Sequence, residues 1–346
     1  MGVPETSLLG STQGALLGLH DLVMFDLDGV VYVSGHALDG VPERLERVRA
    51  AGVHLAFVTN NASRTPEQVA QHLEELGVRA EAKDVVTSAQ AAARLLVERF
   101  GAGARILMLG GEGLRSALEA EGLVPLEEPD DVVALASGYG PDVRWRDIMR
   151  AATLVRDGLP YVASNTDHTI PTSYGLAPGH GVLVGTISGF AGVEPVVAGK
   201  PARPLMEETI RRVGGSRPLM VGDRLDTDIE GAHAVGVDSL LVMTGVTHLV
   251  DLVAAGPHLR PTYVAADMEG LFEAHPAPAW AEAAATLGGW RAIVEEGRLH
   301  VEGSGSSSDW WRVVAVAAWR HLDDAGQPVD IEGLSPPVAS EAAARG

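Results

Sequence analysis

Short apolar runs that alternate with amphipathic segments set the pattern of this chain. The runs at residues 22–25, 53–58 and 217–221 have the length and composition of buried strands, and polar side chains follow each of them. Residues 88–100 instead place apolar side chains at helical spacing. This alternation predicts an α/β fold built on a parallel sheet.

The first run ends in two carboxylates one residue apart, Asp26 and Asp28, which Gly29 follows. Side chains alternate along a strand, so both carboxylates point to one side and Leu27 points to the other. Two like charges held this close need a cation or a proton between them. Metal-assisted chemistry is therefore the first hypothesis, and the alternative is an ordinary Asp-Gly turn.

Polar residues also follow the other two runs. Thr59 and Asn60 end the second run, and the segment GDRLDTDI after the third contains Asp223 and Asp228, while Lys200 lies between Gly199 and Pro201 shortly before it. In open parallel α/β sheets, ligands bind beyond the carboxyl ends of the strands. We therefore expect these residues to converge on one site.

Composition draws attention to Lys200. Of the 26 basic residues, only Lys83 and Lys200 are lysines, so this chain uses arginine almost everywhere else. A lysine in a Gly-x-Pro turn suggests a position where a compact ammonium fits and a planar guanidinium does not. Chance is the alternative explanation for a single lysine.

These four pieces, in this order, resemble the haloacid dehalogenase superfamily of phosphohydrolases. The superfamily pattern is DxD, then Thr or Ser at a strand end, then Lys, then an acidic GDxxxTD. The resemblance implies a Rossmann-like parallel-sheet core and a Mg²⁺ cofactor. It also implies the following roles: Asp26 as nucleophile, Asp28 as general acid and base, Thr59 as phosphate-binding hydroxyl, Lys200 as the charge-neutralising lysine, and Asp223 with Asp228 as the acids on the metal side.

Phosphoryl transfer spreads negative charge over three equatorial oxygens, so catalysis is mostly positioning and cationic stabilisation. Asp26 would attack phosphorus and form an aspartyl-phosphate. Asp28 would protonate the leaving alkoxide and later take a proton from the hydrolytic water. Because the dehalogenase and ion-pump branches lack an Asp at this second position, Asp28 argues against both.

Mg²⁺ prefers oxygen ligands and keeps several waters. We expect Asp26, the backbone carbonyl of Asp28 and the side chain of Asp223 as direct ligands, with Asp228 orienting a metal-bound water. Asp226 has two interpretations: it contacts the site, or it caps a helix that begins near Thr227. The phosphoryl oxygens would be held by Lys200, Thr59 and the neighbouring backbone amides, including that of Asn60.

Nearly 140 residues separate Asn61 from Lys200, which is about the size of a small domain. Residues 65–68 read as a capping box, and the helix that follows should stop at Gly77. Helix and strand then alternate again, which predicts an inserted α/β cap. This cap resembles the C2 type of subclass IIA, whose members include 4-nitrophenyl-, pyridoxal-, phosphoglycolate- and glycerol-phosphate phosphatases. The predicted parts are a flexible leader (1–18), the core (19–84 and 192–273), the cap (85–191) and a C-terminal accessory domain (274–346).

Two segments of the cap have candidate chemistry. Residues 110–113, Gly-Gly-Glu-Gly, follow a strand, but their spacing is not that of a dinucleotide loop and favours a tight turn. The polar segment from Ser164 resembles the substrate-facing loop of the cap. Its candidates for reading the leaving group are Asn165, Asp167 and His168, and the alternative is a solvated loop with local turns.

The C-terminal segment contains five of the six tryptophans. Residues 297–303 read as a strand, a Gly/Ser stretch breaks the chain at 303–308, and apolar residues between Trp311 and Leu322 fall on one helical face. We expect a small accessory domain that packs on the core or mediates oligomerisation. The resemblance suggests a truncated acetyltransferase-like module, without a visible acyl-CoA loop.

Global properties limit the classes of partner and compartment. The chain has 346 residues and a formal charge of −20, which argues against nucleic acid and anionic membranes. No cysteine is present, so disulfides and zinc thiolate sites are excluded and the cytoplasm is the expected compartment. The first twenty residues lack a basic start and favour a leader over a signal peptide. No apolar segment approaches the length of a membrane span.

The sequence thus predicts Mg²⁺-dependent hydrolysis of a small-molecule phosphomonoester. Long segments, including FVTNNASR and GDRLDTDIEGAHAVG, resemble the actinobacterial glycerol-3-phosphate phosphatases, which makes glycerol 3-phosphate the first expected substrate. Phosphoglycolate, pyridoxal phosphate, sugar phosphates and 4-nitrophenyl phosphate are the alternatives within the subclass. A protein that only binds phosphorylated ligands is the alternative of another class, but the intact acid pair favours an enzyme. A homo-oligomer through the cap or the C-terminal domain is a further expectation.

Overall fold

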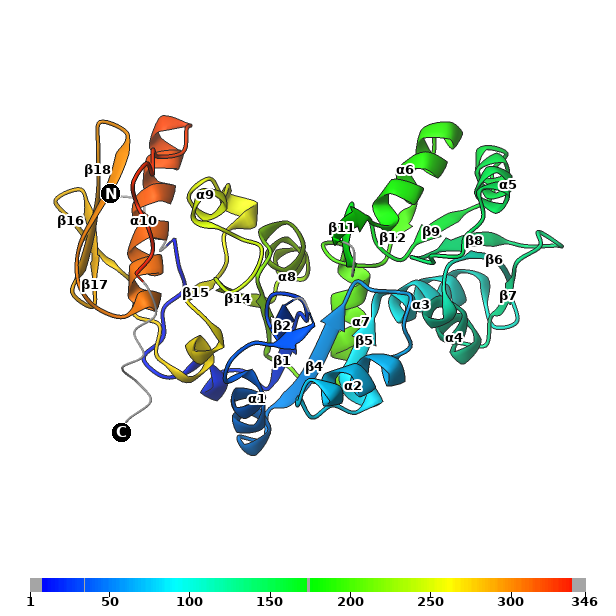
Figure 1. The fold of residues 1–346 in the computed structure, drawn as a ribbon, viewed down its shortest axis with the longest axis horizontal. Helices are drawn as coiled ribbons and strands as arrows, with labels where there is room; N and C mark the ends of the chain where they lie inside the picture. Colours follow the sequence, from blue (N-terminus) through cyan, green and yellow to red (C-terminus); the bar gives the residue numbers. More distant parts are fainter. Residues whose placement is uncertain (1–7, 34, 173–174, 338–346) are drawn as a thin grey trace. The chain divides into compact units, whose positions relative to one another are not determined.

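The computed structural model describes residues 8–33, 35–172 and 175–337 (Figure 1). These residues fall into two compact units. The first comprises residues 8–33, 38–53 and 216–337, and the second comprises residues 35–37, 54–172 and 175–215. This division is coarser than the four predicted domains, whose boundaries stay a prediction. No helix of the described residues is long and apolar enough to cross a membrane.

Four parallel strands of the first unit lie in the order β15-β14-β13-β1. All four residues of β1 are buried, as expected for a strand that is covered on both faces of a parallel sheet. The pairing of β1 with β13 joins Leu22 to Pro218 and Phe25 to Val221, so both strands end at one edge. The main elements of this part are β1 (Leu22–Phe25), β2 (Tyr32–Val33), α1 (Val41–Ala50), β13 (Pro218–Gly222), α8 (Glu230–Val235), β14 (Asp238–Val242), α9 (Leu249–Val253) and β15 (Tyr263–Ala265), with short η1 (Leu16–Gly18), η3 (Leu225–Ile229), η4 (Pro257–Leu259) and η5 (Met268–Phe272).

The C-terminal part of the first unit is an antiparallel sheet with one long helix. Strands β16 (Ala279–Ala281), β17 (Ala284–Leu287), β18 (Trp290–Glu295) and β19 (Arg298–Gly303) are followed by α10 (Ser307–Ala325). The predicted strand, break and helix are therefore present. The apolar stripe is packed in the core as expected, and burial extends beyond one face of the helix, because every residue from Trp310 to Trp319 is buried. In Figure 1 the helix lies between its own sheet and α9, so both of its sides are covered.

The predicted flexible leader also needs correction for the part that the structure describes. Leu9 and Leu16 are buried, and Leu9 belongs to the same core cluster as α10. The backbone N–H of Gly10 donates to the carbonyl of Thr262 at 2.8 Å. Apolar side chains and backbone hydrogen bonds thus fix this segment, and residues 1–7 of the predicted leader lie outside the described residues.

The second unit contains a five-stranded parallel sheet in the order β12-β9-β8-β6-β7 and a parallel pair, β4 with β5. In Figure 1, α5 and α6 lie on one side of the five-stranded sheet, and α3 and α4 lie on the other. The elements are β3 (His36–Ala37), β4 (His54–Thr59), α2 (Pro66–Glu75), η2 (Ala82–Asp84), β5 (Val85–Thr87), α3 (Ser88–Phe100), β6 (Arg105–Leu109), α4 (Glu112–Ala120), β7 (Val124–Leu126), β8 (Ala134–Ser137), α5 (Trp145–Arg156), β9 (Tyr161–Ala163), β10 (Thr169–Thr172), β11 (Gly175–Pro178), α6 (His180–Ala191), β12 (Val196–Val197) and α7 (Arg203–Val213).

Local signals of the sequence determine several of these elements. The predicted capping box is present at the start of α2, where Thr65 and Gln68 bond reciprocally. The Gly-Gly-Glu-Gly turn leads into α4, and a Cβ on Gly113 would lie 2.4 Å from the carbonyl oxygen of Arg64. Close passage of the chain therefore requires glycine there. The polar segment after Ser164 is not only a loop, because it also contains the antiparallel hairpin of β10 and β11.

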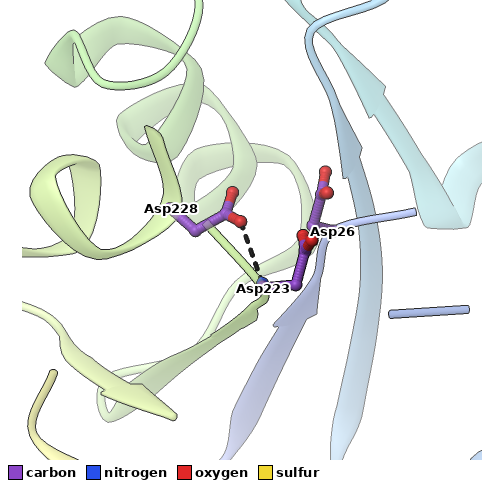
Figure 2. A group of neighbouring side chains, drawn as sticks. All are labelled: Asp26, Asp223 and Asp228. Atoms are coloured by element: carbon purple, nitrogen blue, oxygen red, sulfur yellow. Dashed lines mark hydrogen bonds between the residues drawn. The ribbon is translucent and has the colours of Figure 1, made fainter. Parts of the chain in front are cut away.

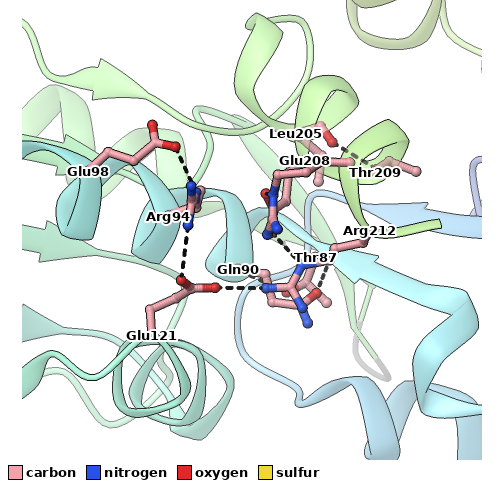
Figure 3. A network of polar contacts seen from close by, with 10 residues as sticks. Thr87, Gln90, Arg94, Glu98, Glu121, Leu205, Glu208, Thr209 and Arg212 are labelled. Carbon is pink, nitrogen blue, oxygen red and sulfur yellow. Dashed lines mark hydrogen bonds and ion pairs between the residues drawn. The ribbon is translucent and has the colours of Figure 1, made fainter. Parts of the chain in front are cut away.

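An ion-pair network connects three helices of the second unit (Figure 3). Buried Glu208 of α7 pairs with Arg211 and Arg212. Arg212 also reaches Glu121 at 3.1 Å, and Glu121 pairs with Arg94 of α3. Because α7 begins three residues after Lys200, this network fixes the helix that follows the lysine loop.

We expect Trp319→Ala to lower the free energy of unfolding by about 3–5 kcal/mol. Trp319 is completely buried, and its indole N–H donates to the carbonyl of Leu252 at 2.7 Å. The substitution opens a cavity and removes one of the donors to that carbonyl, which also accepts from the N–H of Ala255 at 3.2 Å. Urea unfolding followed by circular dichroism measures the change. Val250→Ala is the control because Val250 is 57% exposed, and equal losses in both variants would contradict this account of the core.

A buried histidine makes the stability of the second unit depend on pH. His180 hydrogen-bonds through Nε2 to the hydroxyl of Ser137 at 3.0 Å, and burial lowers the pKa of His180 to about 4. The unfolded chain binds a proton at a pKa near 6.5. The stability from neutral His180 is therefore fully present above pH 6.5 and is lost as the pH falls towards 4.

We therefore expect the parent to lose roughly 2 kcal/mol more unfolding free energy than His180→Gln when the pH falls from 7 to 5. Glutamine does not titrate in this range, so the variant lacks the part of the stability change that comes from protonation of His180. Urea unfolding at the two pH values measures it. Parallel losses in the two proteins would show that His180 is not the titrating group.

Candidate active site

Three carboxylates of the first unit form a compact cluster at the ends of β1 and β13. Asp26, Asp223 and Asp228 each place one oxygen within 4.8 Å of the others, and Figure 2 shows the side chains directed towards one another. Asp223 and Asp228 are fully buried, and Asp26 is half-buried. The structure therefore brings together three of the acids that the sequence analysis expected at one site.

The backbone around Asp26 explains this geometry. Its N–H donates to the carbonyl of Val221 at 2.9 Å, which continues the pairing of the two strands beyond Phe25. The strand itself ends at Phe25, and beyond it Leu27 is buried and Asp28 is exposed. Asp28 accepts a weak hydrogen bond from Tyr32 Oη at 3.5 Å and is not a member of the carboxylate cluster.

Glycines allow the chain to pass the buried carboxylate closely. Gly29 has a φ of +86°, and a Cβ there would lie 2.3 Å from Asp223 Oδ2. A Cβ on Gly245 would lie 2.0 Å from the same oxygen. The Asp-Gly turn was the alternative to metal-assisted chemistry in the sequence analysis. In the structure this turn is itself part of the acidic site.

Backbone amides hold the two buried acids in place. Asp223 Oδ2 accepts from the N–H of Val246 at 2.6 Å. Asp228 Oδ2 accepts from the N–H groups of Asp223 and Arg224 at 3.2 and 3.1 Å. Of the two interpretations of Asp226, the structure contradicts the helix cap, since the helical turn already begins at Leu225 and Asp226 pairs with Arg224 instead.

The chemistry of these donors fits a hard divalent cation. Carboxylate oxygens are the ligands that Mg²⁺ prefers, and three of them converge here without a histidine or a sulfur ligand among them. Mutual repulsion of three nearby carboxylates also favours a cation between them. Asp26 and Asp223 are the candidates for direct ligation.

Two further predicted residues lie in the second unit. Thr59 ends β4, and its hydroxyl oxygen accepts from the N–H of Asn61 at 3.1 Å, so the hydroxyl proton points elsewhere. Lys200 is 2% exposed, with Nζ 3.4 Å from the carbonyl of Val58. The other lysine, Lys83, is exposed and pairs with Glu81. Burial distinguishes Lys200 from Lys83, and the predicted contact of Lys200 with a phosphoryl group stays a prediction.

The cap candidates differ in their surroundings. Asn165 is buried, donates through Nδ2 to the carbonyl of Asn60 at 2.7 Å and accepts from the N–H of Asp167 at 3.1 Å. Asp167 accepts from Asn60 Nδ2 at 3.1 Å, and His168 is exposed. Asn165 thus shapes the loop, and its predicted contact with substrate stays a prediction, as do those of Asp167 and His168.

Comparison with known proteins identifies the family. A family model described as haloacid dehalogenase-like hydrolase matches residues 23–124, and a second, described as HAD-hydrolase-like, matches residues 197–271. The D-glycerol 3-phosphate phosphatase of Mycobacterium tuberculosis is 41% identical over 328 residues, which cover 90% of each chain. The chain belongs to the haloacid dehalogenase-like hydrolases. The membership of this superfamily that the sequence motifs predicted, and the predicted fold class, are confirmed.

Other members show how far the likeness extends. A crystal structure of glycerol phosphate phosphatase from M. tuberculosis in complex with magnesium superimposes with a TM-score of 0.83 at 40% identity, and covers 92% of this chain and 94% of that chain. The acid sugar phosphatase of Staphylococcus aureus is 36% identical over 71% of this chain and 94% of its own length. A 4-nitrophenylphosphatase from Thermotoga maritima gives a TM-score of 0.68 at 30% identity, with 75% and 97% coverage. The two shorter relatives cover about three quarters of this haloacid dehalogenase-like chain.

We expect Asp223→Asn to weaken Mg²⁺ binding at least about tenfold, because it removes a charged oxygen from the centre of the cluster. Isothermal titration of the protein with MgCl₂ measures the affinity. Asp226→Asn is the matched control, since this exposed carboxylate pairs with Arg224 outside the cluster. Unchanged affinity in Asp223→Asn would contradict the proposed metal position.

Proposed function

We propose that this protein is a Mg²⁺-dependent phosphatase that hydrolyses a small-molecule phosphomonoester through an aspartyl-phosphate. The observation that carries the proposal is the acid pair Asp26 and Asp28 at the end of β1, with Asp26 in a carboxylate cluster that fits Mg²⁺. Membership of a hydrolase family supports it. A protein that only binds phosphorylated ligands has no use for a nucleophile and a proton donor together.

The reaction has two displacement steps at phosphorus. A carboxylate oxygen of Asp26 forms a bond to phosphorus while the bond to the leaving alkoxide breaks, and Asp28 gives its proton to that alkoxide. Asp28 then takes a proton from water, whose oxygen attacks phosphorus. The bond from Asp26 to phosphorus breaks, and inorganic phosphate leaves with the starting carboxylate restored.

Asp26, the backbone carbonyl of Asp28 and Asp223 would hold Mg²⁺, while Asp228 would orient a water bound to it. When bound, Mg²⁺ neutralises charge on the phosphoryl oxygens. The Thr59 hydroxyl has its oxygen occupied by Asn61 N–H, so its proton suits a phosphoryl oxygen. We assign the other phosphoryl contacts to the ammonium of Lys200 and to the backbone N–H of Asn60.

The first substrate that we propose is glycerol 3-phosphate, because of the long, 41% identical match to a D-glycerol 3-phosphate phosphatase. Sugar phosphates, phosphoglycolate, pyridoxal phosphate and 4-nitrophenyl phosphate are the other substrates to compare. We place recognition of the leaving group in the cap, at Asn165, Asp167 and His168. The cap is proposed to comprise residues 85–191, inserted in a core of residues 19–84 and 192–273, with a truncated acetyltransferase-like module at 274–346.

We also propose a homo-oligomer formed through the cap, and a cytoplasmic location. Large apolar side chains are exposed on two neighbouring helices, Trp145 and Met149 on α5 and Val182 and Phe190 on α6. Helix α6 contributes no Asp, Glu, Lys or Arg of its own to this surface, where the guanidinium of Arg156 on α5 lies 5.6 Å from the ring centre of Phe190, so a second copy that covers α6 would bury few charges. Sedimentation velocity of the parent and of a Trp145→Glu, Phe190→Glu double variant decides between a dimer and a monomer.

We expect Asp26→Asn to reduce phosphate release from glycerol 3-phosphate by at least about a thousandfold, because an amide is a very poor nucleophile at phosphorus. The parent should also lose its activity in EDTA and recover it with MgCl₂. The assay compares glycerol 3-phosphate, phosphoglycolate and pyridoxal phosphate at matched concentration. Asp324→Asn, at an exposed position of α10, is the control for the substitution itself.

Phosphate release by Asp26→Asn at the parental rate would show that another group attacks phosphorus. Tight binding of these compounds without any release by the parent would favour the noncatalytic alternative.

A further inference from the structure

We propose that Asn60 is a positioning residue whose side-chain amide ties the Lys200 loop to the cap loop of Asp167. The inference rests on the proposed function, because it gives a role to a residue of the same site. It also separates the side chain of Asn60, which holds two loops together, from its backbone N–H, to which we assign the contact with the phosphoryl group.

The amide clamps the backbone of the lysine from two sides. Asn60 Oδ1 accepts from the N–H of Lys200 at 2.8 Å, and Nδ2 donates to the carbonyl of Lys200 at 3.0 Å. A residue bonded at both its N–H and its C=O has its peptide planes fixed. The direction in which its side chain leaves the backbone is then fixed as well.

The same amide reaches the cap loop. Asn60 Nδ2 donates its other hydrogen to Asp167 Oδ1 at 3.1 Å. An amide nitrogen carries two hydrogens, and these two contacts use both of them. The side chain therefore has no further donor to offer a phosphoryl oxygen.

The backbone of Asn60 completes the junction. Its carbonyl accepts from Ser88 Oγ at 2.6 Å and from Asn165 Nδ2 at 2.7 Å. A Cβ on Gly199 would lie 2.6 Å from Asn60 Oδ1, which explains why a glycine precedes the lysine. Asn60 thus joins the end of β4, the start of α3, the cap loop and the lysine loop.

Only an amide can make these contacts at neutral pH. Its oxygen must accept from an N–H while its nitrogen donates to a carbonyl and a carboxylate. In Asn60→Asp, an oxygen would replace Nδ2 and would face two acceptors at hydrogen-bond distance. Two carboxylates so close share one proton, which raises the pKa of the pair. The variant should therefore recover its clamp in acid.

The experiment compares the parent, Asn60→Asp and Asn61→Asp at pH 8 and pH 5.5, with glycerol 3-phosphate and MgCl₂. At pH 8 we expect Asn60→Asp to lose at least about tenfold in kcat/KM, and at pH 5.5 the ratio to the parent should rise several-fold. Asn61→Asp is the matched control, because Asn61 accepts from Ser63 through its side-chain oxygen, which aspartate retains. Its ratio to the parent should be the same at both pH values.

Melting temperatures of the same three proteins give a readout that does not need catalysis. The pKa of the new carboxyl is raised in the folded state, so acid should narrow the gap in melting temperature between Asn60→Asp and the parent. Asn60→Ser, which removes the amide without adding a charge, should show a loss that does not change with pH.

The inference would be overturned if Asn60→Asp had the kcat/KM of the parent at pH 8. It would also be overturned if its losses of activity and of melting temperature were the same at both pH values. Absence of phosphate release from the parent would instead overturn the proposed function, and the melting temperatures would still decide whether the amide clamp exists.

Discussion

Mutual repulsion among three carboxylates is the constraint on which this site depends. Asp26, Asp223 and Asp228 converge to within 4.8 Å, and two of them are fully buried. Burial and like charges both disfavour the ionised form, so the arrangement is unfavourable without a cation. The fold nevertheless holds the three carboxylates together. Strand pairing positions Asp26, backbone amides bond the two buried acids, and glycines at positions 29 and 245 allow the chain to pass close to Asp223. Such local cost is typical of sites whose ligand offsets it.

The second unit holds a buried positive charge in an equally constrained way. Lys200 is one of only two lysines, it is buried, and its backbone is bonded on both sides by a single amide. A fixed backbone orients the flexible side chain of Lys200 in advance. Binding a substrate then costs less conformational entropy, because this side chain does not have to be ordered each time. The same amide extends to the loop of Asp167, so under the proposed roles of Lys200 and Asp167 one side chain would connect phosphate binding with recognition of the leaving group. Cleavage and specificity should therefore change together when it is altered.

Strand ends, together with the resemblance to a known superfamily, indicated the three acids that form the cluster. Asp26 was recognisable because a carboxylate directly follows a buried apolar run, and the capping box at Thr65 was recognisable because its signal is local. The role of the Asn60 side chain was not recognisable in this way. Its partners lie 107 and 140 residues further along the chain, and nothing in its neighbourhood records them.

Long-range packing also explains the other errors. Leu9 joins the core of α10 and residues near Thr262, so a segment without periodicity of its own becomes ordered. The apolar stripe of α10 correctly predicted a helix, but a stripe does not reveal that a second layer covers the opposite side. Both cases depend on partners that the local sequence does not identify.

Thermal unfolding of the parent and of Asp26→Asn, each with and without MgCl₂, tests the central claim most directly. Removing one charge should relieve repulsion, so without Mg²⁺ the variant should melt at a higher temperature than the parent. Mg²⁺ should raise the melting temperature of the parent and raise that of the variant much less. A parent that gains nothing from Mg²⁺, or a variant that gains as much as the parent, would contradict the claim that this cluster is built around a cation.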